Sequence, residues 1–454
     1  MGRSPRGRVV TSRPQRIHSL RVRLPDSIRA EGLGAPLHIV AGILAAAFLL
    51  YQSLLPLSAT RPYPDFWHFN ADSHRISFEQ PGGPHDMARY QGSKHPLFVV
   101  IGAPLHRVAR AVYRRVAPEP LAENLALTFP VAVLGALNAG VALFLFRAAG
   151  FAMGPALLLV ALYAGSAAIV VFSAFPDSYI CTTFFTNLFL LAWLRDRDLE
   201  HWRLLALLTA LAGLAAPQQM LLTLVPIAAL QAGGRLPVYA ARAAKYGLTA
   251  VVLFAVPFAA QLAMAMSGDV AGFVGHEATR WSSLGNLVDA QHWATVLLVF
   301  MNVALVLSVP VDTLDPVELA GMVEHAGMWL SGVVVLAYGV LGRVWCGRVA
   351  GHLREMCLGL VAFVAAYVAF FVWWTPTEAF IYSAPLVMPL WLLLHAPWVD
   401  VQHRLEWRAA VAVAALVVAA HSAWTVATLP ERDDYLRVRS KWEAPSVAVR
   451  PPMA

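Results

Sequence analysis

Hydrophobic positions along this 454-residue chain form long uncharged blocks, without the two-residue rhythm of half-buried strands or the amphipathic rhythm of soluble helices. A membrane-spanning helix needs about 20 consecutive apolar residues. Suitable blocks lie near 36–57, 122–146, 152–174, 178–194, 204–232, 246–267, 292–311, 327–342, 356–376, 379–398 and 408–429. The 204–232 block is long enough for two spans, and Pro217-Gln218-Gln219 interrupts it at the middle. We therefore predict a tight helical hairpin there, with both glutamines as solvated turn residues, and up to twelve apolar segments in all.

This pattern predicts an all-α integral membrane protein, because a membrane barrel would alternate apolar and polar residues. The composition agrees, with 58% hydrophobic and 13% charged residues, whereas soluble proteins contain about 25% charged residues. A soluble globule and a disordered chain are both excluded. The first block begins near Pro36, behind a basic region, and is too long for a signal peptide. We expect it to remain as the first span.

The net charge of +7 is concentrated at the N-terminus. Two carboxylates, Asp26 and Glu31, oppose eight arginines in residues 1–36: Arg3, Arg6, Arg8, Arg13, Arg16, Arg21, Arg23 and Arg29. No aromatic residues interleave with them as a base-stacking surface would require, so nucleic acid is not the expected partner. Residues 1–35 are instead predicted to be a basic cytoplasmic tail, attracted to anionic lipid head groups.

Basic loops indicate the orientation, because loops rich in Lys and Arg stay in the cytoplasm. With the N-terminus inside, Arg195–Arg203 and Arg235–Lys245 also fall inside. Two further basic loops, Arg343–Arg354 and His403–Arg408, fall inside only if one segment between 246 and 327 does not cross the membrane. We expect this segment to be 292–311, as a re-entrant or interfacial helix. The prediction is a transmembrane domain over 36–429 with about eleven spans (range 10–13), and an external C-terminal tail at 430–454.

Four segments then face the outside: a long first loop at 58–120, a turn at 175–179, the stretch 268–326 and the turn at 374–382. The first loop conflicts with the charge rule, since it contains Arg107, Arg110, Arg114 and Arg115. Val108, Val112 and Val116 are spaced against these arginines as in an amphipathic helix, so 104–118 is predicted to lie on the membrane surface.

The first loop also holds the clearest chemistry. An acid, a base and cations lie within about 25 residues in three groups, Asn70–Arg75, Asp86–Tyr90 and Lys94–Phe98. A single external Asp is usually a solvated loop charge, but this mixture beside apolar Phe66, Trp67 and Phe69 favours a site.

The arrangement resembles the GT-C glycosyltransferases, polytopic enzymes that take sugar from a polyprenyl-phosphate lipid. The resemblance lies in the layout of the first 200 residues: a basic N-terminus, one span, Asp72 near the start of a long loop, and His95-Pro96-Leu97-Phe98 opening a surface helix. The turn Pro176-Asp177-Ser178-Tyr179 and the late element Glu378–Ser383 match two further family features. Ser73 departs from the Asp-Glu pair of some members.

The resemblance implies transfer of a sugar, on the external face of a bacterial inner membrane, to a glycan, lipid or protein acceptor. Asp72 is the implied general base, and direct attack on the anomeric carbon would invert its configuration. Cations would stabilise the departing phosphate. The implied substrate-binding residues are Arg75, Lys94 and Arg280 toward the phosphate, with Asp86, Tyr90, His95, Asp177, Glu378 and Tyr382 toward the sugar or acceptor.

Several alternatives stay open. Asp86 competes with Asp72 as the base. Asp177 and Glu378 could instead stabilise helix starts. A divalent cation between Asp72 and Asp86 is the alternative to a site without a cofactor. His395 and His421 lie in apolar blocks and are expected to bond a neighbour. None of the three cysteines forms a C-x-x-C pair, so neither a disulfide framework nor a thiolate metal site is indicated.

The main rival function is a secondary transporter or lipid flippase, which would place ionisable residues within its spans. A membrane acyltransferase that uses a His in place of Asp72, and a non-catalytic scaffold, are the other two.

Overall fold

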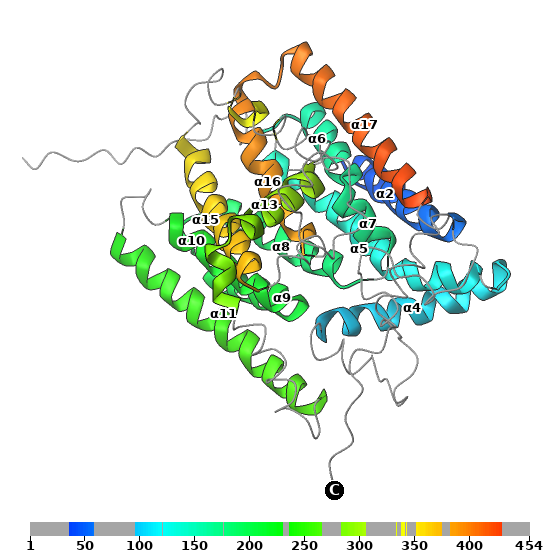
Figure 1. The fold of residues 1–454 in the computed structure, drawn as a ribbon, viewed down its shortest axis with the longest axis horizontal. Coiled ribbons are helices and arrows are strands. Elements are labelled where there is room, and N and C mark those ends of the chain that lie inside the picture. Colours follow the sequence, from blue (N-terminus) through cyan, green and yellow to red (C-terminus); the bar gives the residue numbers. More distant parts are fainter. Residues whose placement is uncertain are drawn as a thin grey trace, which may run out of the picture.

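The computed structural model describes residues 36–58, 96–119, 121–175, 177–229, 236–265, 283–305, 351–374 and 382–428, with 333, 337–340 and 342 between them. Every regular element in these ranges is a helix, as predicted (Figure 1). The elements are α2 (Leu37–Ser58), α4 (Pro96–Val116), α5 (Leu121–Ala148), α6 (Met153–Gly165), α7 (Ala167–Ala174), α8 (Tyr179–Arg195), α9 (Trp202–Ala215), η2 (Pro217–Thr223), α10 (Leu224–Ala229), α11 (Leu236–Ala265), η3 (Ser283–Val288), α13 (Ala290–Leu305), α15 (Gly351–Trp374), α16 (Ala384–His395), η6 (Ala396–Val401) and α17 (Leu405–Thr428).

Six helices of the described residues are long and apolar enough to cross a membrane, or seven if the bent pair α6–α7 counts as one span. The six spans are Leu37–Leu54, Leu121–Ala148, Pro237–Ala260, Leu353–Trp374, Ala384–Val401 and Leu405–Ala423. The all-α membrane fold is therefore confirmed. The predicted count of eleven spans stays a prediction, because parts of several apolar blocks lie outside the described residues.

Helix α5 lies at the centre of the bundle. Its span is 72% buried within the protein, against 17% for α2 and for α11, which lie at the periphery. Helices α2, α4 and α8 pack directly on α5, while α17 packs along α6 at one edge of the bundle and α11 along α9 at the other (Figure 1).

The predicted span 152–174 is bent by 60° between α6 and α7. Ser166 at the break has an extended backbone, and its hydroxyl donates to the carbonyl of Tyr163 (2.7 Å). The hydroxyl of Tyr51 on α2 donates to the carbonyl of Ala164 (2.8 Å). These hydroxyls supply donors to carbonyls at the break in the helix, where water is excluded.

The predicted hairpin at Pro217 is present. Helix α9 ends at Ala215, and η2 with α10 returns along α15. The hydroxyl of Tyr246 on α11 contacts both arms, because it pairs with Thr209 Oγ1 (2.8 Å) and donates to the carbonyl of Leu222 (3.5 Å). Thr209 and Leu222 are placed nearly symmetrically about the break at Ala216, as residues at one level of a hairpin must be.

The hairpin is not a pair of full spans, however. Helix α9 has 14 residues, or about 21 Å at 1.5 Å per residue, which is shorter than the roughly 30 Å hydrocarbon core. Its tip therefore ends inside the bundle. We call residues 202–229 the polar-tipped hairpin.

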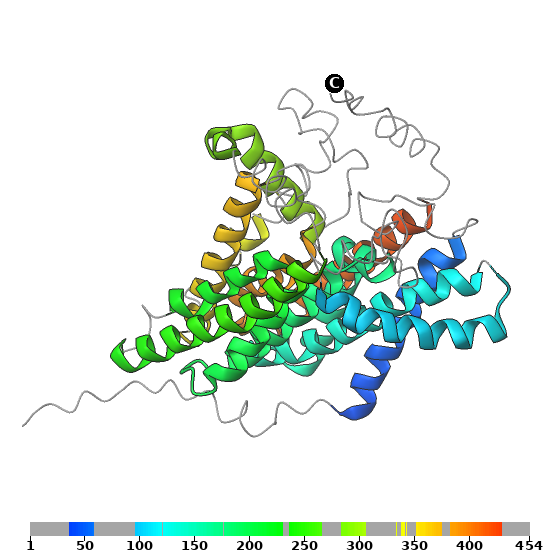
Figure 2. The ribbon, with the colours of Figure 1, turned by 90° about the horizontal axis from the view of Figure 1, so that it is seen from below.

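Three of the predicted cytoplasmic loops lie together at one end of the bundle. Arg242 on α11 donates to the carbonyl of Asp198 in the α8–α9 loop (2.7 Å). Burial lowers the pKa of Arg197 in the same loop, and the carboxylate of Glu355 at the start of α15 counteracts this. We call this the basic end; α15 runs from it to the opposite end, where η3 and the start of α13 lie (Figure 2).

Candidate active site

Described residues of three predicted external segments meet where α15 ends. The rings of Tyr179, after the 175–178 turn, and Tyr382, before α16, make an edge-to-face contact with their centroids 5.0 Å apart. The side chain of Asn286 in η3 donates to the carbonyl of Trp373 (3.3 Å). Segments separated by about 200 residues in sequence are thus neighbours in space, which is the arrangement that a composite site requires.

Asp177 is the ionisable group of this region, and its side chain is only 2% exposed. Its carboxylate accepts hydrogen bonds from the backbone N–H and the hydroxyl of Ser178. Ser178 is the N-cap residue of α8 and makes no side-chain cap bond of its own. The capping alternative for Asp177 stays a prediction, beside the interpretation that a buried ionisable group in a membrane bundle marks a functional site.

The Asp177 turn is also recessed. The side-chain amide of Asn138 on α5 donates to the carbonyl of Ile180 at the start of α8 (3.1 Å). Asn138 lies 17 residues beyond Leu121, the first residue of α5, which is about 26 Å along the helix axis. The turn that was predicted as a short external loop thus lies deep beside α5, far from the helix end where α4 joins it.

Aromatic rings surround Tyr382. Its ring stacks on Phe371 with a centroid distance of 4.5 Å and contacts Trp374 at 5.7 Å, in addition to Tyr179. Phe300 of α13 contacts Phe371 from the other side at 6.0 Å. A mostly aromatic wall with a few fixed polar groups is typical of small-molecule sites.

A chain of hydrogen bonds connects Tyr382, in this aromatic wall, to helix α8. Thr186 Oγ1 on α8 donates to Gln219 Oε1 (3.1 Å), Gln219 Nε2 donates to the hydroxyl of Tyr367 (3.1 Å), and that hydroxyl donates to the carbonyl of Tyr382 (3.0 Å). The prediction that Gln218 and Gln219 are solvated was wrong, since they are 7% and 0% exposed. The short arms of the polar-tipped hairpin place them inside the protein, where their amides need protein partners.

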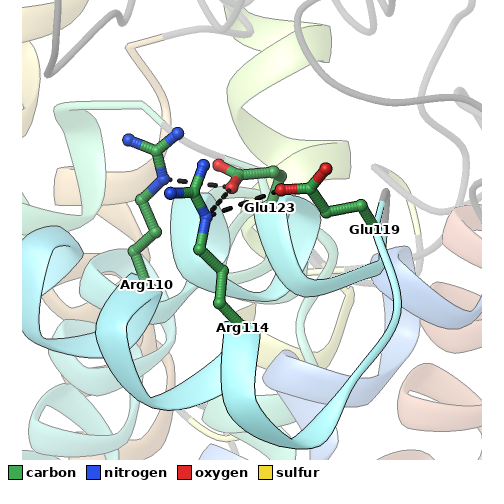
Figure 3. Close-up of polar contacts among 4 residues, drawn as sticks. All are labelled: Arg110, Arg114, Glu119 and Glu123. Carbon is green, nitrogen blue, oxygen red and sulfur yellow. Dashed lines mark hydrogen bonds and ion pairs between the residues drawn. The ribbon is translucent and has the colours of Figure 1, made fainter.

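Helix α4 covers most of the segment 104–118, and its position on the membrane surface stays a prediction. Val108, Val112 and Val116 are 63%, 53% and 75% exposed. On another side, Glu123 Oε1 of α5 accepts from the Nε atoms of Arg110 (3.0 Å) and Arg114 (2.7 Å), as Figure 3 shows. Two of the four arginines that conflicted with the charge rule are thus paired with a carboxylate, and Arg114 also lies 3.6 Å from Glu119.

Of the predicted site residues, the described part of the chain contains Asp177 and Tyr382, and the structure brings their turns together. The others lie outside the described residues: Asp72, Arg75, Asp86, Tyr90, Lys94, His95, Arg280 and Glu378. Thr186, Gln219 and Tyr367 were missed, although a Gln-Gln pair in an apolar block was a signal, because polar groups in a membrane must find partners.

The remaining expectations concern ligands. His395 bonds a neighbour as predicted, because its Nδ1 lies 2.8 Å from the hydroxyl of Tyr338. Cys181 and Cys357 take part in no disulfide bond. No group of three or more His, Cys, Asp or Glu side chains that could hold a metal occurs among the residues described.

No protein-family model and no curated protein matches the chain. Among solved structures it is similar to the Archaeoglobus fulgidus oligosaccharyltransferase, crystallised with a tethered acceptor peptide, at 15% identity and a TM-score of 0.42. The similarity covers 86% of this chain and 55% of that protein, so the chain spans about half of its length. At this identity and TM-score, the similarity assigns neither a family nor an activity to this chain.

Proposed function

We propose that the protein is a membrane glycosyltransferase that moves a sugar from a polyprenyl-phosphate donor to an acceptor hydroxyl at the end of the bundle opposite the basic end. The observation that carries the proposal is the buried carboxylate of Asp177 beside the aromatic wall of Tyr382, where three separate segments meet. Burial of a carboxylate is costly, and ionisable residues within a membrane bundle commonly belong to functional sites.

In the proposed reaction, the carboxylate of Asp72 accepts the proton of the acceptor hydroxyl as its oxygen attacks the anomeric carbon. The bond from that carbon to the phosphate oxygen breaks, and the polyprenyl phosphate leaves with the electron pair. Arg75, Lys94 and Arg280 would pair with the phosphate, for which Arg offers two parallel donors. Asp177 would accept hydrogen bonds from sugar hydroxyls, with the rings around Tyr382 against the apolar face of the sugar.

The proposed orientation places the basic end in the cytoplasm of a bacterial inner membrane, following the positive-inside rule. Arg197 and Arg242 lie at this end and follow the last residue of α8. The Asp177 turn precedes the first residue of α8 and lies deep beside α5. A reporter fused after residue 350 should therefore read as cytoplasmic. An external reading would reverse the assignment and place the site on the wrong side for a polyprenyl-linked sugar on the outer face.

The first experiment identifies co-purifying lipids by native mass spectrometry for wild type, Asp72→Asn and Asp177→Asn. Asp400→Asn is the matched control, because Asp400 is exposed and lies in η6, outside the candidate site. We expect wild type and the control to retain a glycosyl polyprenyl phosphate. Asp72→Asn should retain or enrich it, since loss of a general base typically slows turnover by 10² to 10⁴-fold without removing binding.

Asp177→Asn should lower retention, on the order of tenfold, because a hydrogen bond to a charged group is lost. Bulk phospholipid alone in every sample would count against the transferase. In that case the buried carboxylate of Asp177 would favour the transporter, since ionisable groups inside a bundle also mark transport paths.

A further inference from the structure

The hydrogen-bond chain through the polar-tipped hairpin has a fixed direction. A carbonyl oxygen can only accept, so the hydroxyl of Tyr367 must give its hydrogen to the carbonyl of Tyr382. Its lone pair is then available to Gln219 Nε2, which places Gln219 Oε1 toward the donating hydroxyl of Thr186. Thr186, Gln219 and Tyr367 are all fully buried, so water does not compete for these bonds.

This chain connects the two sides of the candidate site, the Asp177 turn and Tyr382, to one side chain, Gln219. Helix α8 carries the Asp177 turn at its beginning and Thr186 two turns further along. Tyr382 directly precedes Ser383 and α16. Gln219 bonds to α8 on one side and, through Tyr367, to Tyr382 on the other. The distance between the Asp177 turn and Tyr382 therefore depends on the hairpin tip.

We propose that Gln219 and Tyr367 are positioning residues: the tip of the polar-tipped hairpin sets the distance between the Asp177 turn and Tyr382. The role in sugar-lipid binding rests on the proposed function, whereas the role in holding Tyr382 does not. Neither residue touches the substrate in this proposal. They act by keeping the ring of Tyr382 against Tyr179, at the observed centroid distance of 5.0 Å.

The test of position uses a cysteine as a reporter. Ser383 is fully buried next to Tyr382, so Ser383→Cys is introduced after Cys181, Cys346 and Cys357 are replaced by Ala. Its rate of reaction with N-ethylmaleimide is then measured with Tyr367 intact and with Tyr367→Phe. Tyr367→Phe removes two buried hydrogen bonds, and we expect labelling to accelerate on the order of tenfold or more. Gln219→Leu should act in the same direction.

Tyr163→Phe is the matched control. The hydroxyl of Tyr163 is equally buried and accepts a hydrogen bond from Asn187 (2.8 Å), but no bond leads from it to Tyr382. Labelling of Ser383→Cys should be unchanged in this variant. An unchanged rate in Tyr367→Phe, or an equal acceleration in Tyr163→Phe, would overturn the positioning role, because the effect would then be absent or a general loosening of the bundle.

The second readout is the retained lipid. Tyr367→Phe with normal gel-filtration behaviour and melting temperature should retain several-fold less glycosyl polyprenyl phosphate than wild type and Tyr163→Phe. Faster labelling with full lipid retention would refute the link between position and binding. If wild type itself retains no such lipid, the proposed function fails, while the labelling rates still decide whether the hairpin holds Tyr382.

Discussion

Replacing Asn187 by Leu should destabilise the bundle at the contact between α8 and its neighbours. The amide Nδ2 of Asn187 donates to Asn138 Oδ1 on α5 and to the hydroxyl of Tyr163 on α6, each at 2.8 Å. All three side chains are fully buried. Since Asn138 also donates to the carbonyl of Ile180, the pair of Asn138 and Asn187 fixes the start of α8 and with it the Asp177 turn.

The magnitude follows from these contacts. Interhelical hydrogen bonds in membrane proteins average about 0.6 kcal/mol each, so two bonds contribute about 1.2 kcal/mol. The acceptors on Asn138 and Tyr163 then lose their donor inside the protein, and an unsatisfied buried group costs about 1 kcal/mol or more. Two such acceptors bring the total to about 3 kcal/mol, so we expect Asn187→Leu to lower the free energy of unfolding by about 3 kcal/mol.

The assay is reversible unfolding in mixed micelles for Asn187→Leu, Asn138→Leu and the double variant. Asn138→Leu should cost more than Asn187→Leu, because it also removes the bond to Ile180. The double variant should be less destabilised than the sum of the two by about 1 kcal/mol, the coupling expected of residues in contact. Thr183→Val is the control, since Thr183 donates only within α8, to the carbonyl of Tyr179 (2.8 Å). Additive effects of the two Asn variants would refute the reasoning.

Four further outcomes are expected. Gln402→Ala removes two hydrogen bonds to the turn between α5 and α6 and should lower the free energy of unfolding by about 1–2 kcal/mol, measured by thermal denaturation. Burial lowers the pKa of His106, so the folded protein favours its neutral form and stability is lost as the pH falls below the unfolded pKa of about 6.5. His106→Gln should therefore reduce the drop in melting temperature between pH 7.5 and 5. Gly135→Ala would place a Cβ 2.5 Å from Ser173 Cβ and should cost about 1–3 kcal/mol, with partial recovery in the double variant with Ser173→Gly. Glu123→Gln should weaken the pairs with the α4 arginines by no more than about 1 kcal/mol, and the difference from wild type should shrink in high salt, whereas a salt-independent difference would show that packing dominates.

Part of the fold could be predicted because membrane burial imposes a simple rule on sequence. An uncharged apolar block of about 20 residues has few stable alternatives to a helix. The blocks 36–57, 122–146 and 408–429 are accordingly helices close to the predicted bounds. The proline at 217 also marked a chain reversal, because proline removes a backbone donor and ends the preceding helix.

The depth of each segment could not be predicted in the same way. Gln219 was expected at a solvated tip, yet it is buried, because α9 stops after 14 residues and its neighbours extend further. The Asp177 turn was expected at the surface, yet it lies beside the middle of α5. Neither sequence window contains information about how far the packed neighbours reach.

The sequence by itself determined that the chain is a helical membrane protein, where several of its long helices lie, and which of its loops are basic. Those properties depend on the transfer of side chains and backbone groups from water into an apolar phase, which is local along the chain. Only the tertiary structure decided that Tyr179, Gln219, Tyr367 and Tyr382 form one connected group. Such a group depends on hydrogen bonds and ring contacts between helices far apart in sequence, whose relative depth and rotation are set by packing.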